Sequence, residues 1–299
     1  MSAIEGALSS LSNVILGKNQ QLKLSMCCLL ADGHLLIEDL PGMGKTTLSH
    51  ALAQVFGLKY SRIQFTSDLL PADIIGVSIF EKSPDSGEGA FRFHQGPVFA
   101  QVVLADEINR ATAKSQSALL EAMEERQVTV EGQTRKLPEP FFVIATQNPS
   151  SQGGTFPLPE SQLDRFLMCL SLGYPDARAE RELLEGVSRR HLVDELKAVI
   201  SPEALSGLRQ AVDGVKASSA VLDYLQRILA FSRNDTRFTH GLSPRAGIAL
   251  LRAAKAWAVI DGRSFLIPED VQAVLAPVVD HRLKPGAARH ILENVAALA

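Results

Sequence analysis

Up to about residue 173, the chain repeats short, almost continuously apolar runs that alternate with stretches of helical apolar spacing. Strands with apolar side chains at consecutive positions are covered on both faces, which is typical of parallel sheets whose strands are joined by helices. Each run is too short for an ordinary helix and has the length of a strand. The sequence therefore predicts an α/β fold around a parallel sheet, with strands at 34–38, 60–65, 101–106, 141–146 and 166–172.

Two segments inside this pattern alternate apolar and polar residues instead, and each contains a polar turn. In the first, the alternation runs up to Ile79 and resumes from Phe91 after a glycine-rich stretch. Period-two patterns on both sides of turn residues predict β-hairpins. We expect inserted hairpins near 77–93 and 127–138, which are either surface decorations or functional elements.

After Tyr174 and Pro175 the sequence shows only helical patterns. Successive amphipathic stretches have Pro, Gly or Ser at most of their starts and ends, as helix boundaries do. We therefore expect two domains. An α/β core that includes an N-terminal helix would cover 1–174, and an all-α domain would cover 175–299.

The first predicted strand runs directly into E-D-L-P-G-M-G-K-T-T, and apolar helical spacing begins at once. A strand, a glycine-rich turn and a helix are together the context of a phosphate-binding loop, G-x-x-x-x-G-K-[ST]. Gly42 and Gly44 allow backbone angles that point N–H groups at phosphate oxygens, and the helix N-terminus adds positive partial charge. Asp39 replaces the first glycine of the motif. Because that position mainly helps the chain leave the strand, we expect nucleotide binding to persist.

The side chains of this loop have separate expected roles. Lys45 would reach the β- and γ-phosphates, and the Thr46 hydroxyl would bind Mg²⁺. The predicted nucleotide-binding residues of the loop are Pro41, Gly42, Met43, Gly44, Lys45, Thr46 and Thr47.

A later strand, in Q-V-V-L-A-D-E, ends in two acids. Asp106 and Glu107 thus stand at the C-terminal edge of the sheet, where open α/β sheets bind their ligands. Alone, such a pair is better explained as a helix N-cap. Together with the phosphate loop, it predicts that Asp106 holds Mg²⁺ through water and that Glu107 is the general base that polarises the attacking water.

Three further polar residues have weaker local signals. Asn148 follows another buried strand, where an amide could orient the lytic water, although the position also suits an ordinary turn. Arg245 stands in the first turn of a helix expected to begin at Pro244, where the helix dipole disfavours a cation unless an anion lies nearby. A solvated surface arginine is the alternative. Arg165 precedes the last strand, either as a structural partner of a carboxylate or as a functional cation.

Bulk properties disfavour several classes of function. A net charge of −3 and a pI near 6.2 give no overall basic field, so nucleic-acid binding through bulk charge is disfavoured. The three cysteines lack metal-ligand spacing and are expected to be buried thiols. The apolar runs are far shorter than the ~20 residues of a membrane-spanning helix, and the chain start does not resemble a signal peptide. We therefore expect a cytoplasmic protein without direct membrane insertion.

The order of these pieces resembles the MoxR family of AAA+ ATPases over nearly the whole chain. P-G-M-G-K-T-T, V-V-L-A-D-E-I-N-R-A, I-A-T-Q-N-P, L-P-E-S-Q-L-D-R-F and G-L-S-P-R-A follow one another as in that family. The last two motifs are much more specific than the phosphate loop. The family is similar to this sequence in tolerating a residue other than glycine at the position of Asp39. The resemblance implies a P-loop AAA+ core with inserted hairpins, followed by a helical lid domain.

The resemblance also implies roles for residues with weak local signals. The loop would be Walker A and the two acids Walker B, while Asn148 would be sensor 1 and Arg245 sensor 2. Arg165 would be the arginine finger that contacts the nucleotide of a neighbouring subunit. The segment N-V-I-L-G-K-N is similar to the adenine-flanking segment of the family, which makes candidate base contacts of Val14, Ile15 and Gly17.

These assignments imply a mechanism. ATP with Mg²⁺ would lie between subunits of a homo-oligomeric ring, expected to be a hexamer, because a finger given by a neighbour requires that neighbour. Hydrolysis would move the lid against the core and shift the hairpins, which resemble pore-facing elements that engage a client. The implied activity is chaperone-like. It would remodel or mature a client protein complex, with a partner that carries a von Willebrand factor A domain.

Other interpretations stay open on the sequence alone. One is a nucleotide-dependent assembly switch with little turnover. Another is a DNA-translocating motor, since helicases of the same clade share the hairpins, although the acidic balance makes nucleic-acid binding a weaker expectation. A magnesium-chelatase-like motor subunit is a near relative that the sequence excludes only weakly.

Overall fold

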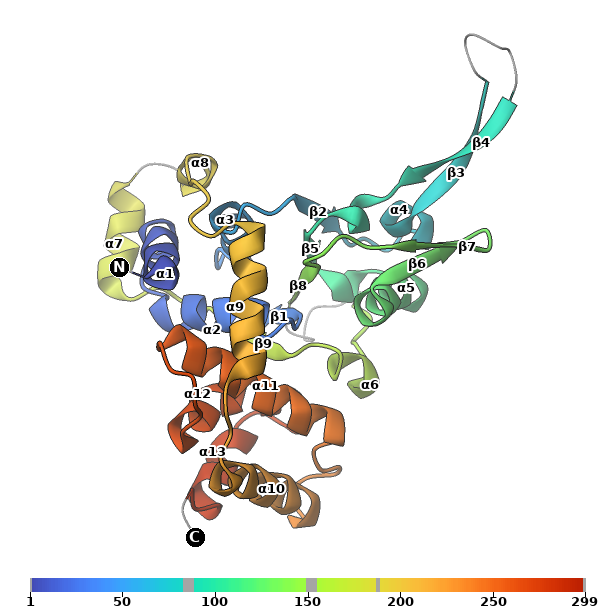
Figure 1. The fold of residues 1–299 in the computed structure, drawn as a ribbon. Helices are drawn as coiled ribbons and strands as arrows, with labels where there is room; N and C mark the ends of the chain where they lie inside the picture. The colour runs from blue at the N-terminus through green and yellow to red at the C-terminus, as the bar shows by residue number, and fades with distance from the viewer. Residues whose placement is uncertain (1, 83–88, 149–154, 187–188, 298–299) are drawn as a thin grey trace.

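The computed structural model describes residues 2–82, 89–148, 155–186 and 189–297 of the 299-residue chain. At its centre lies a five-stranded sheet with the order β2-β5-β8-β1-β9, in which every neighbouring pair is parallel (Figure 1). All five predicted strands are present, which confirms the α/β class. Their bounds are Leu35–Glu38 (β1), Tyr60–Gln64 (β2), Val102–Asp106 (β5), Phe142–Gln147 (β8) and Met168–Leu170 (β9).

Alternate residues of each strand point to opposite faces of the sheet, so each strand contributes to two apolar clusters. Ile37 and Leu104 belong to one cluster, and their neighbours Leu36 and Val103 belong to the other. Helices cover both faces, which explains the continuously apolar strands of the sequence. The first face is covered by α1 (Ala3–Val14), α2 (Asn19–Leu30) and α3 (Lys45–Val55), and the second by α4 (Pro71–Ile75) and α5 (Ala113–Glu125).

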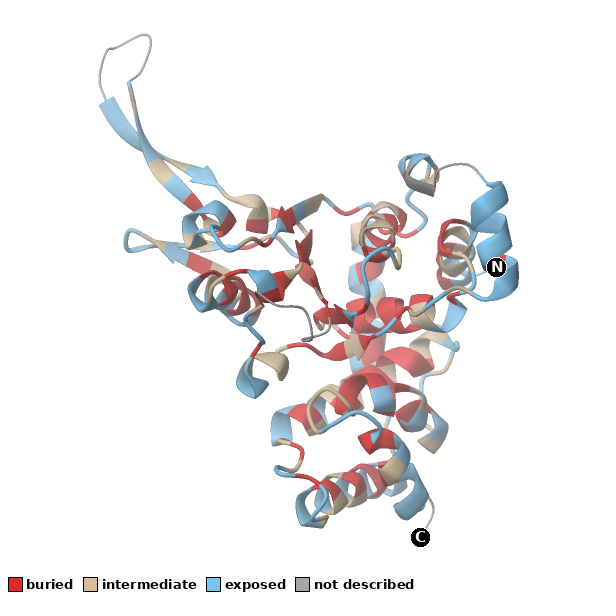
Figure 2. Cartoon of the chain, turned by 180° about the vertical axis from the view of Figure 1, so that it is seen from behind, coloured by how far each residue is buried: buried red, intermediate tan, exposed pale blue. Residues whose placement is uncertain are grey.

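Both predicted hairpins are present as separate two-stranded antiparallel sheets. In Figure 1 the hairpin of β3 and β4 projects far from the body, and Figure 2 shows it mostly exposed. Its expected tip at 83–88 lies outside the described residues. In the second hairpin, Glu131 and Gly132 both have positive φ, as a two-residue type I′ turn requires. The strands are β3 (Gly76–Lys82), β4 (Gly89–Gln95), β6 (Gln127–Val130) and β7 (Gln133–Lys136).

The elements that follow β9 in the described part of the chain are helices, as the sequence predicts. Asp176, Ser201, Ser218 and Ser243 each cap a helix by accepting a hydrogen bond from the backbone N–H three residues later. These helices are α7 (Ala177–Glu185), α8 (Arg189–Asp194), α9 (Pro202–Gly214), α10 (Ser219–Asn234), α11 (Pro244–Ile260), α12 (Pro268–Val279) and α13 (Ala287–Asn294). Before β9, the described residues also form the short helices η1 (Pro97–Phe99), η2 (Ile108–Arg110) and α6 (Glu160–Leu163).

The helical region packs directly on the core. Helices α10 to α13 lie together beyond α2, whereas α7 and α8 lie at the end of the molecule where α1 is found (Figure 1). One apolar cluster joins α1 to α3 with lid residues such as Leu250 and Val274. The domain boundary at 174/175 therefore stays a prediction. No helix in the described ranges is long and apolar enough to cross a membrane.

Candidate functional site

The predicted phosphate-binding loop connects β1 to α3 at the C-terminal edge of the sheet. Gly42 and Gly44 have φ of 84° and 87°, a left-handed conformation that favours glycine. Helix α3 begins at Lys45 without a side-chain cap, so the N–H groups of its first turn can donate hydrogen bonds to a bound anion. A cavity of about 290 Å³ opens here and is lined by Pro41, Gly42, Met43, Gly44, Lys45, Thr46, Thr47, Asp106, Glu107 and Asn148.

Lys45 is buried with its ammonium held by two neutral oxygens. Nζ donates to the backbone oxygen of Asp39 at 2.6 Å and to Oδ1 of Asn148 at 3.2 Å. Burial lowers the pKa of Lys45, and the carboxylates of Asp39 and Asp106 oppose that shift. A phosphate that entered the cavity would meet a preformed cation at the helix N-terminus.

Asn148 links the lysine to the second acid. Its Nδ2 donates to Oε1 of Glu107 at 3.1 Å, while its Oδ1 accepts from Lys45. Its backbone oxygen accepts from the side chain of Asn109 at 3.1 Å. The structure thus brings Asn148 into the cavity beside the two groups that the sequence placed there. Pro149, which follows it, lies outside the described residues.

The two acids at the end of β5 are held by different partners. Oδ1 of Asp106 accepts a 2.6 Å hydrogen bond from the hydroxyl of Thr146, and that hydroxyl accepts from the backbone N–H of Glu107 at 2.9 Å. Oδ2 of Asp106 pairs with the guanidinium of Arg62 at 2.6 Å. Asp106 is therefore buried but fully hydrogen-bonded as a carboxylate.

Glu107 has a left-handed backbone conformation, with φ of 57°, directly after β5. Its Oε2 accepts from Gln64 at 3.1 Å and from Arg110 at 2.9 Å. A non-glycine residue in this conformation is uncommon and is often found at functional sites. The carboxylate is thus fixed at the cavity wall, opposite the loop that would carry the phosphates.

The cavity also fits a divalent cation. The hydroxyl of Thr46 and the carboxylate of Asp106 both line it, and hard oxygen donors of this kind, together with phosphate oxygens, suit Mg²⁺. A metal there would compete with Arg62 for Asp106. These two residues are the ones that the sequence predicts as Mg²⁺ ligands.

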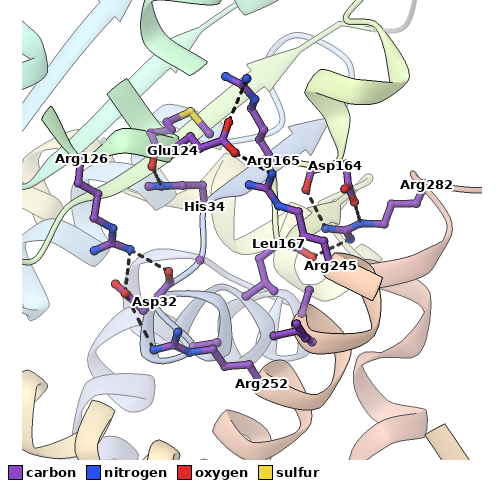
Figure 3. Close-up of a pocket in the computed structure, with 15 residues that line it drawn as sticks. Asp32, His34, Glu124, Arg126, Asp164, Arg165, Leu167, Arg245, Arg252 and Arg282 are labelled. Carbon is purple, nitrogen blue, oxygen red and sulfur yellow. Dashed lines mark hydrogen bonds and ion pairs between the residues drawn. The ribbon is translucent and has the colours of Figure 1, made fainter. Parts of the chain in front are cut away.

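Arg165 and Arg245 lie elsewhere, in a pocket at the opposite edge of the sheet, where β1 begins after His34. Figure 3 shows both arginines beside Glu124. Arg165 pairs with Oε2 of Glu124 at 3.0 Å, and Arg245 donates to Oε1 of the same carboxylate at 2.9 Å. They line a second cavity, of about 280 Å³, near His34 before β1. The structure therefore brings the two arginines together but does not bring either to the phosphate loop of its own chain.

The candidate adenine contacts are not among the residues that line the loop cavity. Val14 and Ile15 are buried at the end of α1. Gly17 has φ of 66° and lies against Asp176 and Ala179, where α7 begins. Their role in base binding stays a prediction.

Several residues of the site were missed by the sequence argument. Arg62 and Gln64 alternate within β2 and point toward the acids, and Gln64 is in register with Asp106. Two polar residues near the end of a strand that is predicted to be buried are a sequence signal that could have placed them in the site. Glu124 gave no comparable signal, because its partners are distant in the sequence.

Comparisons with known proteins agree with this geometry. The family described as "ATPase family associated with various cellular activities (AAA)" matches residues 34–168, and the family described as "AAA lid domain" matches 230–298. The first match contains the loop, both acids, Asn148 and Arg165, and the second contains Arg245.

Similar full-length proteins are also found. "Uncharacterized protein YeaC" of Bacillus subtilis is 44% identical over 93% of this chain and 85% of the relative. "Chaperone MoxR1" of Mycobacterium tuberculosis is 40% identical over 94% and 75%, and "Protein MoxR" of Paracoccus denitrificans is 34% identical over 93% and 87%. A crystal structure from Cytophaga hutchinsonii, of a protein proposed to be an ATPase, superposes with a TM-score of 0.89 at 34% identity. It covers 98% of this chain and 94% of that one.

Proposed function

Because the chain belongs to the MoxR family of AAA+ ATPases, we propose that it hydrolyses ATP at a site completed by a neighbouring copy. One observation carries this proposal. The phosphate loop, Asp106, Glu107 and Asn148 converge on one cavity, whereas Arg165 and Arg245 lie together at the other edge of the sheet. A chain built in this way has two half-sites that face different directions.

Each half lacks what the other offers. The loop half provides the cradle, one lysine and a general base, and the arginine half provides two guanidiniums that share a single carboxylate, Glu124. Charge that develops on the γ-phosphate is stabilised by guanidiniums in phosphoryl transfer. Head-to-tail contact between copies joins the two halves, and repetition of one heterologous contact closes a ring. We propose a hexamer.

The residues of the loop half have distinct tasks. Lys45 and the N–H groups of α3 bind the phosphates, and Glu107 takes a proton from the attacking water. Asn148 and Gln64 hold the Glu107 carboxylate in place from two sides. Mg²⁺, held by Thr46 and Asp106, would neutralise phosphate charge. We propose Asn148 as sensor 1, Arg245 as sensor 2 and Arg165 as the arginine finger.

We further propose that turnover remodels a client protein complex, with a partner that carries a von Willebrand factor A domain. The names of two relatives, "Chaperone MoxR1" and "Protein MoxR", support a chaperone-like role. The exposed hairpin of β3 and β4 offers Phe80 and Phe91, which pack edge to face with ring centroids 5.3 Å apart. Apolar side chains on a projecting element suit contact with another protein.

A mixing experiment tests the shared site. Arg165→Ala and Glu107→Gln should each bind ATP. Phosphate release should fall by about 10³ or more in Arg165→Ala, on the scale of arginine fingers, and by about 10²–10⁴ in Glu107→Gln, on the scale of general bases. Mixed in equal amounts, they should recover activity, because some interfaces then combine an intact Glu107 with an intact Arg165. With random assembly about a quarter of the interfaces of a heterologous ring are restored.

The matched control replaces Arg165→Ala by the double variant Arg165→Ala/Glu107→Gln. Mixing that protein with Glu107→Gln should recover nothing, since no copy supplies the base. Full-rate hydrolysis by Arg165→Ala alone would refute the shared site. So would a complete lack of recovery in mixtures that bind ATP and assemble together. Background rates in the wild type itself would instead favour an assembly switch with little turnover.

A further inference from the structure

Asp39 occupies the position of the first motif glycine, and its carboxylate is buried, with the residue only 8% exposed. Oδ2 accepts hydrogen bonds from the backbone N–H groups of Leu172 and Gly173, both at 2.7 Å, and from the Ser171 hydroxyl at 3.2 Å. Oδ1 accepts from the N–H of Leu40 at 2.9 Å. The side chain is therefore bound to the segment through which the chain leaves β9 for the helical lid.

The main chain of the same residue belongs to the phosphate loop. Its carbonyl oxygen accepts the 2.6 Å hydrogen bond from Nζ of Lys45, and its N–H donates to the oxygen of Gln147, next to Asn148. Asp39 thus touches the predicted phosphate-binding lysine through its backbone and the start of the lid through its carboxylate. A glycine at this position would keep the first contact and lose the second.

The segment that Asp39 holds has the properties of a hinge. Gly173 has φ of 63°, and a Cβ there would meet nothing within 4 Å, so the backbone angle rather than lack of space favours glycine. The next residue, Tyr174, accepts a 2.6 Å hydrogen bond from Nζ of the buried Lys18 through its backbone oxygen. Asp176 then caps α7. Residues 171–176, the hinge segment, are thus held from two sides. In a hinge, a few residues between two elements absorb the change in backbone angle.

We propose that Asp39 is a positioning residue that couples nucleotide occupancy of the phosphate loop to the orientation of the lid. The inference rests on the proposed function, because it supposes that the loop binds ATP. A γ-phosphate draws the Lys45 ammonium toward itself and so alters its hold on the Asp39 carbonyl. The carboxylate transmits the resulting movement to the N–H groups of Leu172 and Gly173. Loop and hinge segment therefore move as one unit.

The test measures the distance between core and lid with and without nucleotide. Spin labels are attached at Glu121→Cys on α5 and Glu293→Cys on α13, both exposed positions. The natural cysteines react slowly, since burial raises the pKa of Cys169 to about 12 and also raises the pKa values of Cys27 and Cys28. Distances are recorded by pulsed electron resonance in full-length protein, with a non-hydrolysable ATP analogue and Mg²⁺.

Two variants at Asp39 remove the coupling, and a third variant, at another aspartate, is the chemically matched control. Asp39→Asn weakens the acceptor and Asp39→Gly deletes it. Because glycine is the ordinary residue of the motif at this position, we expect Asp39→Gly to fold and to keep its phosphate loop. Asp280→Asn is the control. Its carboxylate also accepts two backbone hydrogen bonds, from Gly286 at 3.3 Å and Ala288 at 2.8 Å, but both lie within the lid.

We expect the analogue to shift the interlabel distance in the wild type and in Asp280→Asn. Both Asp39 variants should still bind the analogue and should lose the shift. A shift of wild-type size in the Asp39 variants would overturn the inference, as would an equal loss in Asp280→Asn or a wild type that binds without any shift. A wild type that fails to bind ATP would refute the proposed function instead, which keeps the two failures distinct.

Discussion

The hydroxyl of Thr146 donates a 2.6 Å hydrogen bond to Asp106 and at the same time accepts one from the backbone N–H of Glu107. One side chain on β8 therefore fixes both acids at the end of the neighbouring strand β5. Thr146 itself is buried, so neither bond is readily replaced by water. The position of Glu107, the proposed general base, relative to the proposed phosphate loop depends on this small network.

Thr146→Val keeps the shape of the side chain and removes both hydrogen bonds. We expect a loss of about 1–3 kcal/mol in the free energy of unfolding, because the Glu107 N–H is left without its partner. Phosphate release should slow more than ATP binding weakens, since the base loses its position. Chemical denaturation and steady-state kinetics check this. Thr129→Val, in an exposed threonine pair of the second hairpin, should change neither quantity; equal effects in both variants would contradict the role of Thr146.

Glu107→Gln should separate ATP binding from hydrolysis. The variant retains an acceptor for Asn148 but cannot take a proton from water, and general bases contribute about 10²–10⁴ in rate. We expect near wild-type binding of ATP and a fall of that size in phosphate release. The stalled protein should also retain its client when captured from cells with ATP. Glu125→Gln, an exposed neighbour of Glu124, is the control and should hydrolyse normally.

The fold was largely predictable because its signals are local. Each strand carries its own apolar run, and Glu131-Gly132 determines its own turn. The phosphate loop, Asp106, Glu107 and Asn148 were placed together because each follows a strand of a parallel sheet, so their convergence needs only the common edge. Each apolar run of the sequence corresponds to one strand of the parallel sheet.

The residues that were missed depend on packing between distant segments. Asp39 was judged a tolerated departure from the motif, but its carboxylate is bound by residues more than 130 positions later. Glu124 holds Arg165 and Arg245 only because α5, the start of β9 and α11 meet at one edge. No spacing within one segment contains that information. The sequence alone therefore leaves the roles of the two arginines open and does not indicate that they pair with one carboxylate.

Stability should fall in mild acid because of buried histidines. Nδ1 of His34 accepts from the Val143 N–H at 3.0 Å, and its other ring nitrogen bonds the Met123 carbonyl. Burial, assisted by the nearby Arg126, lowers its pKa to about 4, and burial lowers that of His281 to about 3. Above pH 6.5 both the folded and unfolded chains hold neutral imidazoles. Between pH 6.5 and about 4, only the unfolded chain takes up the proton, so unfolding becomes easier.

For His34 alone the loss across this window is about 3 kcal/mol. Denaturant titrations at pH 7.5, 5.5 and 4.5 should show the decline. His34→Asn should be less stable at pH 7.5 and should show a shallower dependence on pH. The exposed His240→Asn is the matched control and should keep the wild-type slope. If the free energy of unfolding of His34→Asn depended on pH as steeply as that of the wild type, His34 would not be the cause of the decline.

The last prediction concerns the proposed binding of Mg²⁺ by Asp106. Arg62 pairs with Oδ2 of Asp106 at 2.6 Å, although its own side chain is 42% exposed. Mg²⁺ that associates with Asp106 must weaken this pair, so Arg62→Met should lower the Mg²⁺ concentration needed for half-maximal ATP hydrolysis. Partly exposed ion pairs are worth about 0.2–1 kcal/mol, which corresponds to a change of up to about fivefold. Arg92→Met removes a similar exposed pair, with Glu81 on the first hairpin, and should leave the Mg²⁺ requirement unchanged. An increased Mg²⁺ requirement in Arg62→Met would show instead that the guanidinium orients Asp106 for the metal rather than competing with it.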